Sequence, residues 1–72
     1  MENNNIELHF VLHFRNTKDG STYADATCKT IHDAHKTIRD SKRRGWELES
    51  SGIEATRAVG FCEYEQLAYQ QI

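Results

Sequence analysis

Residues 6–15 alternate between large apolar and mostly polar side chains, and this alternation limits the fold more than any other feature of the chain. Successive side chains of a β-strand point to opposite faces of the sheet. A helix would scatter the same apolar residues around its circumference. The segment therefore predicts a strand with one core-facing side, made of Ile6, Leu8, Phe10, Leu12 and Phe14.

The segment after this strand predicts a hairpin. Asn16-Thr17-Lys18-Asp19-Gly20 reads as a turn, because Asp-Gly supplies a residue that tolerates a positive φ. A second strand over 21–28 follows, with Tyr23 as its one large side chain. Its other face, from Thr22 to Cys28, carries small residues that leave room for a helix to lie close to the sheet.

Residues 30–45 carry consistent helix signals. Thr30 is a suitable N-cap, with Asp33 three residues later in a variant of the capping box. Gly45 suits the left-handed position after the last turn. The apolar stripe is Ile31, Ala34, His35 and Ile38, and the basic last turn holds Lys42, Arg43 and Arg44.

The remaining residues predict a third strand and an ambiguous end. Residues 46–50 alternate again and indicate a strand, which Ser51-Gly52 is expected to break or bend. Residues 53–62 are ambiguous, although Ile53, Ala55, Val59 and Phe61 could line one face of a strand, with Arg57 as the exception. Over 63–72 the helical spacing of the apolar residues favours a short helix, and a final strand is the alternative. These residues are Tyr64, Leu67, Ala68 and Ile72.

These elements predict a single compact α+β domain over residues 1–72, with residues 1–5 as a frayed tail. We expect a small antiparallel sheet with one main helix packed on one face, in the order ββαβ plus a short C-terminal helix or strand. The helix should cover the face that carries Leu8, Phe10 and Leu12. A domain of 72 residues buries roughly 60% of its unfolded surface, so a deep substrate cavity is hard to enclose.

Charge and cysteine content narrow the function classes. The net charge is −2, with +2 over residues 1–45 and −4 over residues 46–72, which argues against a general coat for nucleic acid. The chain shows no secretory signal and no apolar run of the ~20 residues that a membrane-spanning helix needs. We expect a cytoplasmic protein with no membrane association and reduced thiols at Cys28 and Cys62, a disulfide between them being the alternative.

The residues do not assemble a catalytic or metal-binding motif. His32 and His35 stand three apart after Cys28, but His32 lies off the apolar stripe and no close cysteine pair completes a ligand set. A cysteine nucleophile would need a base and an orienting group, and no spacing indicates them. We therefore predict no enzyme, no catalytic residue, no cofactor and no metal site.

Two binding surfaces remain as hypotheses. The half-polar face of the first strand and the acidic third strand predict a protein-binding surface of His9, Val11, His13, Tyr23, Glu47 and Glu49. The basic helix end predicts an alternative nucleic-acid surface of Arg39, Lys42, Arg43, Arg44 and Trp46. A homodimer through an exposed sheet edge is also expected.

The order of a hairpin with Asp19-Gly20-Ser21-Thr22-Tyr23, a helix and then Gly45-Trp46 resembles small phage-encoded inhibitors, including some anti-CRISPR proteins. Gly45-Trp46-Glu47-Leu48 is also similar to a segment of small bacterial domains of unknown function. The first resemblance implies a non-catalytic chain that blocks a bacterial defence complex by occupying its surface. We expect a non-enzymatic protein-interaction module, as a phage or mobile-element accessory protein, with a nucleic-acid-binding regulator as the alternative.

Overall fold

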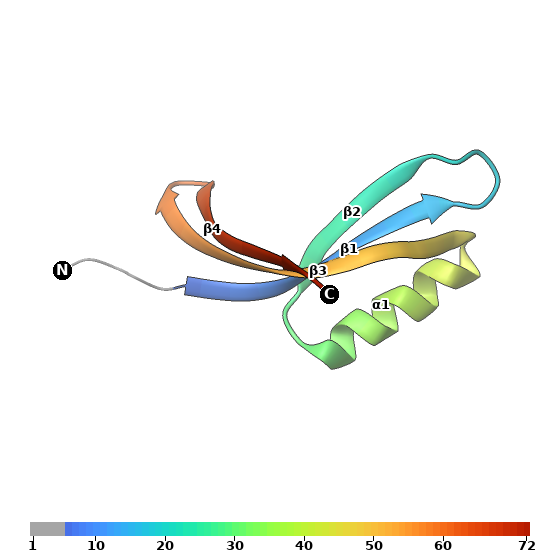
Figure 1. The fold of residues 1–72 in the computed structure, drawn as a ribbon, viewed down its shortest axis with the longest axis horizontal. Coiled ribbons are helices and arrows are strands. Elements are labelled where there is room, and N and C mark those ends of the chain that lie inside the picture. The colour runs from blue at the N-terminus through green and yellow to red at the C-terminus, as the bar shows by residue number, and fades with distance from the viewer. Residues whose placement is uncertain (1–5) are drawn as a thin grey trace.

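A computed structural model describes residues 6–72 as one helix against a four-stranded antiparallel sheet (Figure 1). The strands lie in the order β2-β1-β3-β4, so β2 and β4 form the two edges. The predicted frayed tail, residues 1–5, lies outside the described residues. The elements are β1 (Ile6–Asn16), β2 (Thr22–Cys28), α1 (Ile31–Arg43), β3 (Trp46–Gly60) and β4 (Glu63–Gln71).

The α+β class with one helix and an antiparallel sheet is confirmed, but the order ββαββ does not match the predicted ββαβ. The favoured C-terminal helix is wrong, because residues 63–71 pair as a strand with β3, from Gly60↔Glu63 to Gly52↔Gln71. Of the break or bend expected at Ser51-Gly52, the break is wrong, since β3 runs through both residues without interruption.

The turn predicted between the first two strands and the signals predicted at both ends of the helix are confirmed. Gly20 has φ +76° in the β1–β2 turn and Gly45 has φ +88° after α1. The Thr30 hydroxyl oxygen accepts the amide of Asp33 at 3.1 Å, which satisfies one free N–H of the first helical turn. Local chemistry therefore determines where the hairpin turns and where the helix begins and ends.

The core lies between α1 and one half of the sheet. Phe14 and Leu12 are 0% and 1% exposed, and Cys28 and Ala34 complete the buried cluster. Partly buried side chains surround that cluster: Phe10, Ile38 and Trp46. The alternation of β1 thus identified the correct core-facing side.

Tyr23 also faces the helix, so the expectation that α1 packs on the opposite, small-residue face of β2 is wrong for most of that face; Cys28 is the member that lies in the core under α1. Tyr23 lies directly across from Phe14 in the β1–β2 pairing, which puts both rings on one face. Its ring stacks on Phe14 at a centroid distance of 5.1 Å and meets Trp46 edge-on at 4.7 Å. The Tyr23 hydroxyl is hydrogen-bonded to Ser41 of α1 at 3.2 Å.

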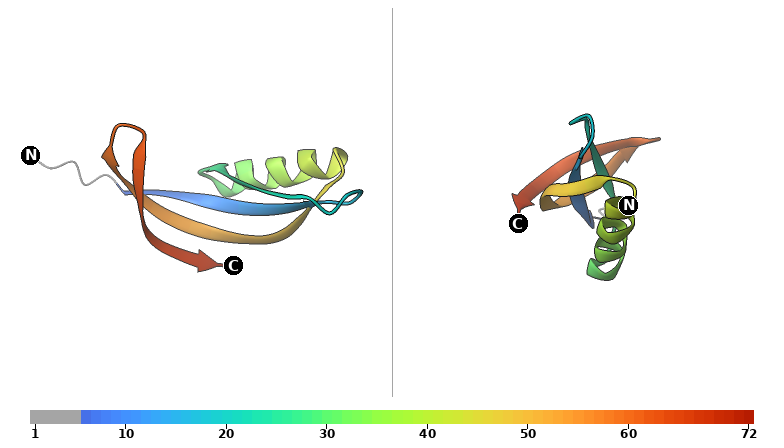
Figure 2. Two further views of the ribbon diagram at one scale, coloured as in Figure 1. Left: turned by 90° about the horizontal axis from the view of Figure 1, so that it is seen from above. Right: turned by 90° about the vertical axis from the view of Figure 1, so that its right-hand side faces the viewer.

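The helix covers part of the sheet only (Figure 2). A helix of 13 residues is about 20 Å long, whereas a strand of 15 residues such as β3 extends over about 50 Å. Leu8 is 61% exposed and Ile6 57% exposed, although both share the face of Leu12. The expectation that α1 covers Leu8 is therefore wrong, because the helix ends before it reaches that residue.

Leu12 and Leu8 offer a matched test of this arrangement. We expect Leu12→Ala to lower the free energy of unfolding by about 2–5 kcal/mol, because it leaves a cavity under α1. Leu8→Ala on the same strand and face should change it by less than about 1 kcal/mol. Urea denaturation followed by circular dichroism measures both values, and equal losses would contradict the described core.

Candidate functional site

The sheet extends beyond the helix, and we call that part the distal half: residues 6–9 of β1, 52–60 of β3 and all of β4. All nine residues of β4 are exposed. Most of the large exposed apolar side chains of the described chain gather in this half and the turn that joins its last two strands. They are Ile6, Leu8, Ile53, Val59, Phe61, Tyr64, Leu67 and Tyr69.

The helix-side face of the distal half holds an open apolar groove of about 430 Å³. Strand pairing explains its composition, because Leu8 lies across from Ala55 and Ala55 lies across from Ala68. Small side chains in one row and larger ones beside them leave a shallow hollow. The groove is lined by Leu8, Ile53, Ala55, Ala68, Tyr69 and Gln70.

The β3–β4 turn adds further exposed apolar side chains to the distal half. Phe61 in the turn is 95% exposed, and Val59 just before it is 55% exposed. An apolar ring that is almost fully solvated contributes nothing to the core of this chain, so the turn adds to the apolar surface that the distal half presents.

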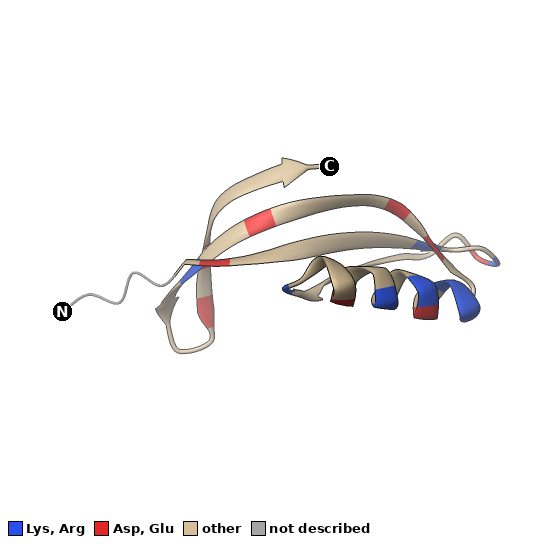
Figure 3. Cartoon of the chain, turned by 90° about the horizontal axis from the view of Figure 1, so that it is seen from below, with Lys and Arg blue, Asp and Glu red and all other residues tan. Residues whose placement is uncertain are grey.

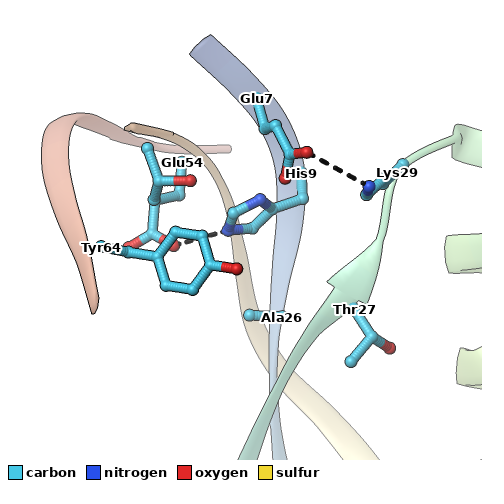
Figure 4. A pocket seen from close by; sticks show the side chains of 8 residues that line it. Glu7, His9, Ala26, Thr27, Lys29, Glu54 and Tyr64 are labelled. Atoms are coloured by element: carbon cyan, nitrogen blue, oxygen red, sulfur yellow. Dashed lines mark hydrogen bonds and ion pairs between the residues drawn. The ribbon is translucent and has the colours of Figure 1, made fainter. Parts of the chain in front are cut away.

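The opposite face of the distal half carries a more polar cleft of about 410 Å³ (Figure 4). His9 lies directly across from Glu54 in the β1–β3 pairing, and its Nε2 is 2.7 Å from a Glu54 carboxylate oxygen. Gln66 of β4 donates to the other oxygen of that carboxylate. At the rim, the Lys29 ammonium is 3.6 Å from Glu7. The cleft is lined by Glu7, His9, Ala26, Thr27, Lys29, Glu54, Thr56 and Tyr64.

The Glu54 carboxylate joins three strands of the distal half. The hydrogen bond from His9, followed by that from Gln66, holds the pKa of Glu54 below its ordinary value of 4.5. The His9 and Glu54 side chains are 12% and 19% exposed, so both groups are largely removed from water. Both oxygens of the carboxylate are hydrogen-bonded, one to His9 and the other to Gln66. We call this set of bonds, which links β1, β3 and β4, the Glu54 clamp; it indicates a structural role rather than that of a free acid or base.

The cysteines and histidines do not meet at this cleft. Cys28 is buried, and its Sγ lies 3.3 Å from the Thr37 hydroxyl under α1. Cys62 is exposed in the β3–β4 turn, and both thiols are free. Within residues 6–72, no three His, Cys, Asp or Glu side chains gather in a way that could hold a metal ion.

The predicted protein-binding residues are not brought together on one open surface. Val11 is buried at 8% exposure, and Tyr23 lies on the helix side of the sheet, opposite to His9. Glu49 receives two hydrogen bonds from Arg15, the shorter at 2.7 Å. His13 is half-buried and Glu47 is exposed on the strand portion beside the helix.

A tyrosine covers the backbone beside Val11. Val11 pairs with Gly52, and a Cβ on Gly52 would lie 2.5 Å from the Tyr69 hydroxyl oxygen and 2.6 Å from the ring carbon that bears it. Gly52 thus lets the Tyr69 side chain lie close to β3. The glycine that suggested a break in the third strand serves this close packing instead.

The predicted nucleic-acid residues are partly brought together. Lys and Arg residues are concentrated along the last turns of α1 (Figure 3), where Arg39, Lys42, Arg43 and Arg44 are exposed. Asp40 lies 3.9 Å from Arg43 and reduces the local charge. Trp46 packs against Tyr23 and is half-buried, so its ring is engaged in the core. This hypothesis stays a prediction.

The apolar groove was missed because coverage by the helix was assumed. The alternation of β1 put Leu8 on the correct face, but the length of the predicted helix also limits how much of that face it can cover. Ile53 and Ala68 fell in segments whose structure the sequence left open.

Comparison with known proteins adds no relative, since no protein family, curated protein or solved structure matches this chain. The described chain also contains no helix with the length and apolar composition to cross a membrane.

The Glu54 clamp predicts a pH dependence of stability. Because the folded-state pKa is depressed, the stabilisation is present above pH 4.5 and is lost as the pH falls through the lower folded-state pKa. Glu54→Gln should therefore unfold more easily than the wild type at pH 7, with a difference that shrinks toward pH 3. Urea denaturation across this range measures the difference. Glu47→Gln, on the exposed part of β3, is the control, and a gap between wild type and Glu54→Gln that does not change with pH would contradict the clamp.

Proposed function

We propose that this protein is a non-enzymatic protein-interaction module that binds its partner through the apolar groove of the distal half. The main support for the proposal is the difference in exposure between two leucines. Leu12 and Leu8 stand on the same face of the same strand, yet Leu12 is 1% exposed and Leu8 61% exposed. The apolar face that forms the core beneath α1 continues past the helix, where it is exposed to solvent. An exposed apolar face of this kind is typical of a binding surface.

The energetics favour a partner of complementary apolar shape. Full burial of a leucine or isoleucine side chain contributes about 1.5–3 kcal/mol. Covering the exposed parts of Ile6, Leu8 and Ile53 would therefore contribute roughly 1 kcal/mol each. Several such contributions are enough to support stoichiometric binding, which requires no turnover.

Charges around the groove would orient the partner. Arg57 is paired with Glu65 at the β3–β4 end, and Glu63 adds a further carboxylate on β4. Since residues 46–72 carry a net charge of −4, a partner with a basic rim around an apolar centre suits this surface. Complementary charges of this kind speed association and select the partner more than they raise affinity.

The resemblance to phage-encoded inhibitors suggests the biological role that we include in this proposal. A module that occupies the surface of a host complex needs an exposed apolar patch and no catalytic constellation. The proposal therefore includes a phage or mobile-element accessory role in which the chain inhibits or regulates such a complex. A cytoplasmic location is part of the proposal and agrees with the free thiols of Cys28 and Cys62.

Capture from bacterial lysate tests the proposal when groove and control variants are compared. We expect the tagged wild-type chain to retain a protein partner in stoichiometric amount, and the double variant Leu8→Glu/Ile53→Glu to lose it. Burying two carboxylates in an apolar interface is strongly unfavourable. Ile31→Glu is the matched control, because Ile31 is 59% exposed on the first turn of α1, outside the groove.

Three results would reject the proposal. Partner retention that the groove variant leaves unchanged would place the interface elsewhere. Turnover of a small molecule without a retained protein would indicate an enzyme. Retention of nucleic acid that weakens steeply with salt, and is lost in Arg43→Glu/Arg44→Glu, would favour the basic end of α1 instead.

A further inference from the structure

Over residues 68–71, the free edge of β4 lacks the features that usually protect a sheet edge. Closer to the β3–β4 turn the pairing of β4 with β3 is irregular, between Ala55 and Thr56 and between Ala58 and Gly60 of β3, but from Ala68 to Gln71 it is regular. Proteins guard exposed edges with lysines, prolines, inward charges or irregular pairing. Residues 66–72 contain no charged residue, no proline and no glycine. All residues of β4 are exposed, and the pairing continues past the strand through the amide of Ile72, which donates to the Ser51 carbonyl at 2.9 Å.

The opposite edge of the same sheet is protected. The pairing of β2 with β1 is irregular between Phe10 and Leu12, which interrupts a regular edge. Within that irregularity, the Asp25 carboxylate accepts both the amide and the hydroxyl of Thr27, at 2.8 and 2.7 Å. Asp25 therefore adds a charge to the β2 edge and occupies one of its amides. The absence of both charge and irregular pairing over residues 68–71 points to pairing at this part of β4.

We propose that a second copy of this chain pairs with the β4 edge, so that two β4 strands run antiparallel about a two-fold axis at Tyr69 and form an eight-stranded sheet. This inference deepens the proposed function and rests on its claim that the distal half is an interface. Antiparallel pairing of a strand with itself is the simplest closed arrangement, because one edge then satisfies an identical edge.

The charge pattern selects this register. With Tyr69 on the axis, Ala68 faces Gln70 of the second copy, so uncharged residues meet uncharged residues over the regular part of the strand. Glu63 and Glu65 stay outside the paired segment. Like charges that face one another across strands are destabilising, and this register contains none.

The same symmetry explains the position of the apolar groove. A two-fold axis perpendicular to the sheet keeps both helices on one side. Ala68 and Gln70 line the groove and also lie on the pairing edge. The grooves of the two copies therefore become neighbours across the seam, and the partner of the proposed function would meet a doubled apolar surface.

A pair of double variants tests the register directly. Ala68→Lys/Gln70→Lys places lysines opposite lysines at two positions across the seam, and we expect self-association to weaken by roughly tenfold or more. Ala68→Lys/Gln70→Glu changes the same two residues but places opposite charges together, so the dimer should be retained. Sedimentation equilibrium over a concentration series measures both, and circular dichroism checks that each variant folds.

The wild type should sediment at twice the chain mass of 8.3 kDa. A wild type that stays monomeric at millimolar concentration, or two double variants that associate equally, would overturn the edge pairing. A dimer broken by Leu8→Glu/Ile53→Glu but insensitive to the β4 variants would also overturn it, in favour of contact through the groove. If the chain is monomeric but still captures a protein through the groove, this inference fails and the proposed function stands.

Discussion

The length of α1 relative to the sheet is the constraint on which the rest of the structure depends. One helix of about 20 Å covers the end of the sheet where Leu12, Phe14 and Ala34 are buried, and it cannot reach the other end. The chain consequently consists of a helix-covered α+β core and a continuation of the same sheet that no helix covers. The core stabilises the continuation through β1 and β3, which run through both parts without interruption.

The distal half owes its order to pairing and polar contacts more than to apolar burial. Ladder hydrogen bonds join β3 to β1 and β4, and the Glu54 carboxylate links His9 of β1 to Gln66 of β4. The Tyr69 ring also packs against Gly52 of β3 in this half. A surface held in this way is preorganised, since its groove exists before a partner arrives, and preorganisation lowers the entropy lost on binding.

The sequence predicted the fold well wherever local signals decide the structure. Alternation identified β1 and its core side, Asp19-Gly20 identified the hairpin, and Thr30 with Gly45 bounded the helix. The favoured prediction failed at β4, because a strand exposed on both faces needs no alternation of apolar and polar residues. The few apolar residues of this segment happen to fall at helical spacing. It also failed at Gly52, because this glycine is explained by its contact with Tyr69, seventeen residues later in the sequence.

The candidate site was less predictable than the fold. Sequence reasoning chose His9, Val11 and Tyr23 as surface residues, and the structure buries or redirects them through neighbours on other strands. The groove residues Leu8 and Ile53 were recognisably apolar, but their exposure follows from how far a helix extends, which alternation does not encode. An apolar binding surface that continues the core of the same sheet therefore has the same sequence pattern as the core.

Hydrogen–deuterium exchange followed by mass spectrometry tests the two-part organisation most directly. At low protein concentration, we predict slow exchange for the amides of α1 and of β1 around Leu12 and Phe14, and fast exchange for those of β4. Protection of β4 should rise when its partner binds or the protein concentration increases. Equal protection of β4 and α1 in the dilute, free chain would contradict the claim that the distal half is an interface rather than a second part of the core.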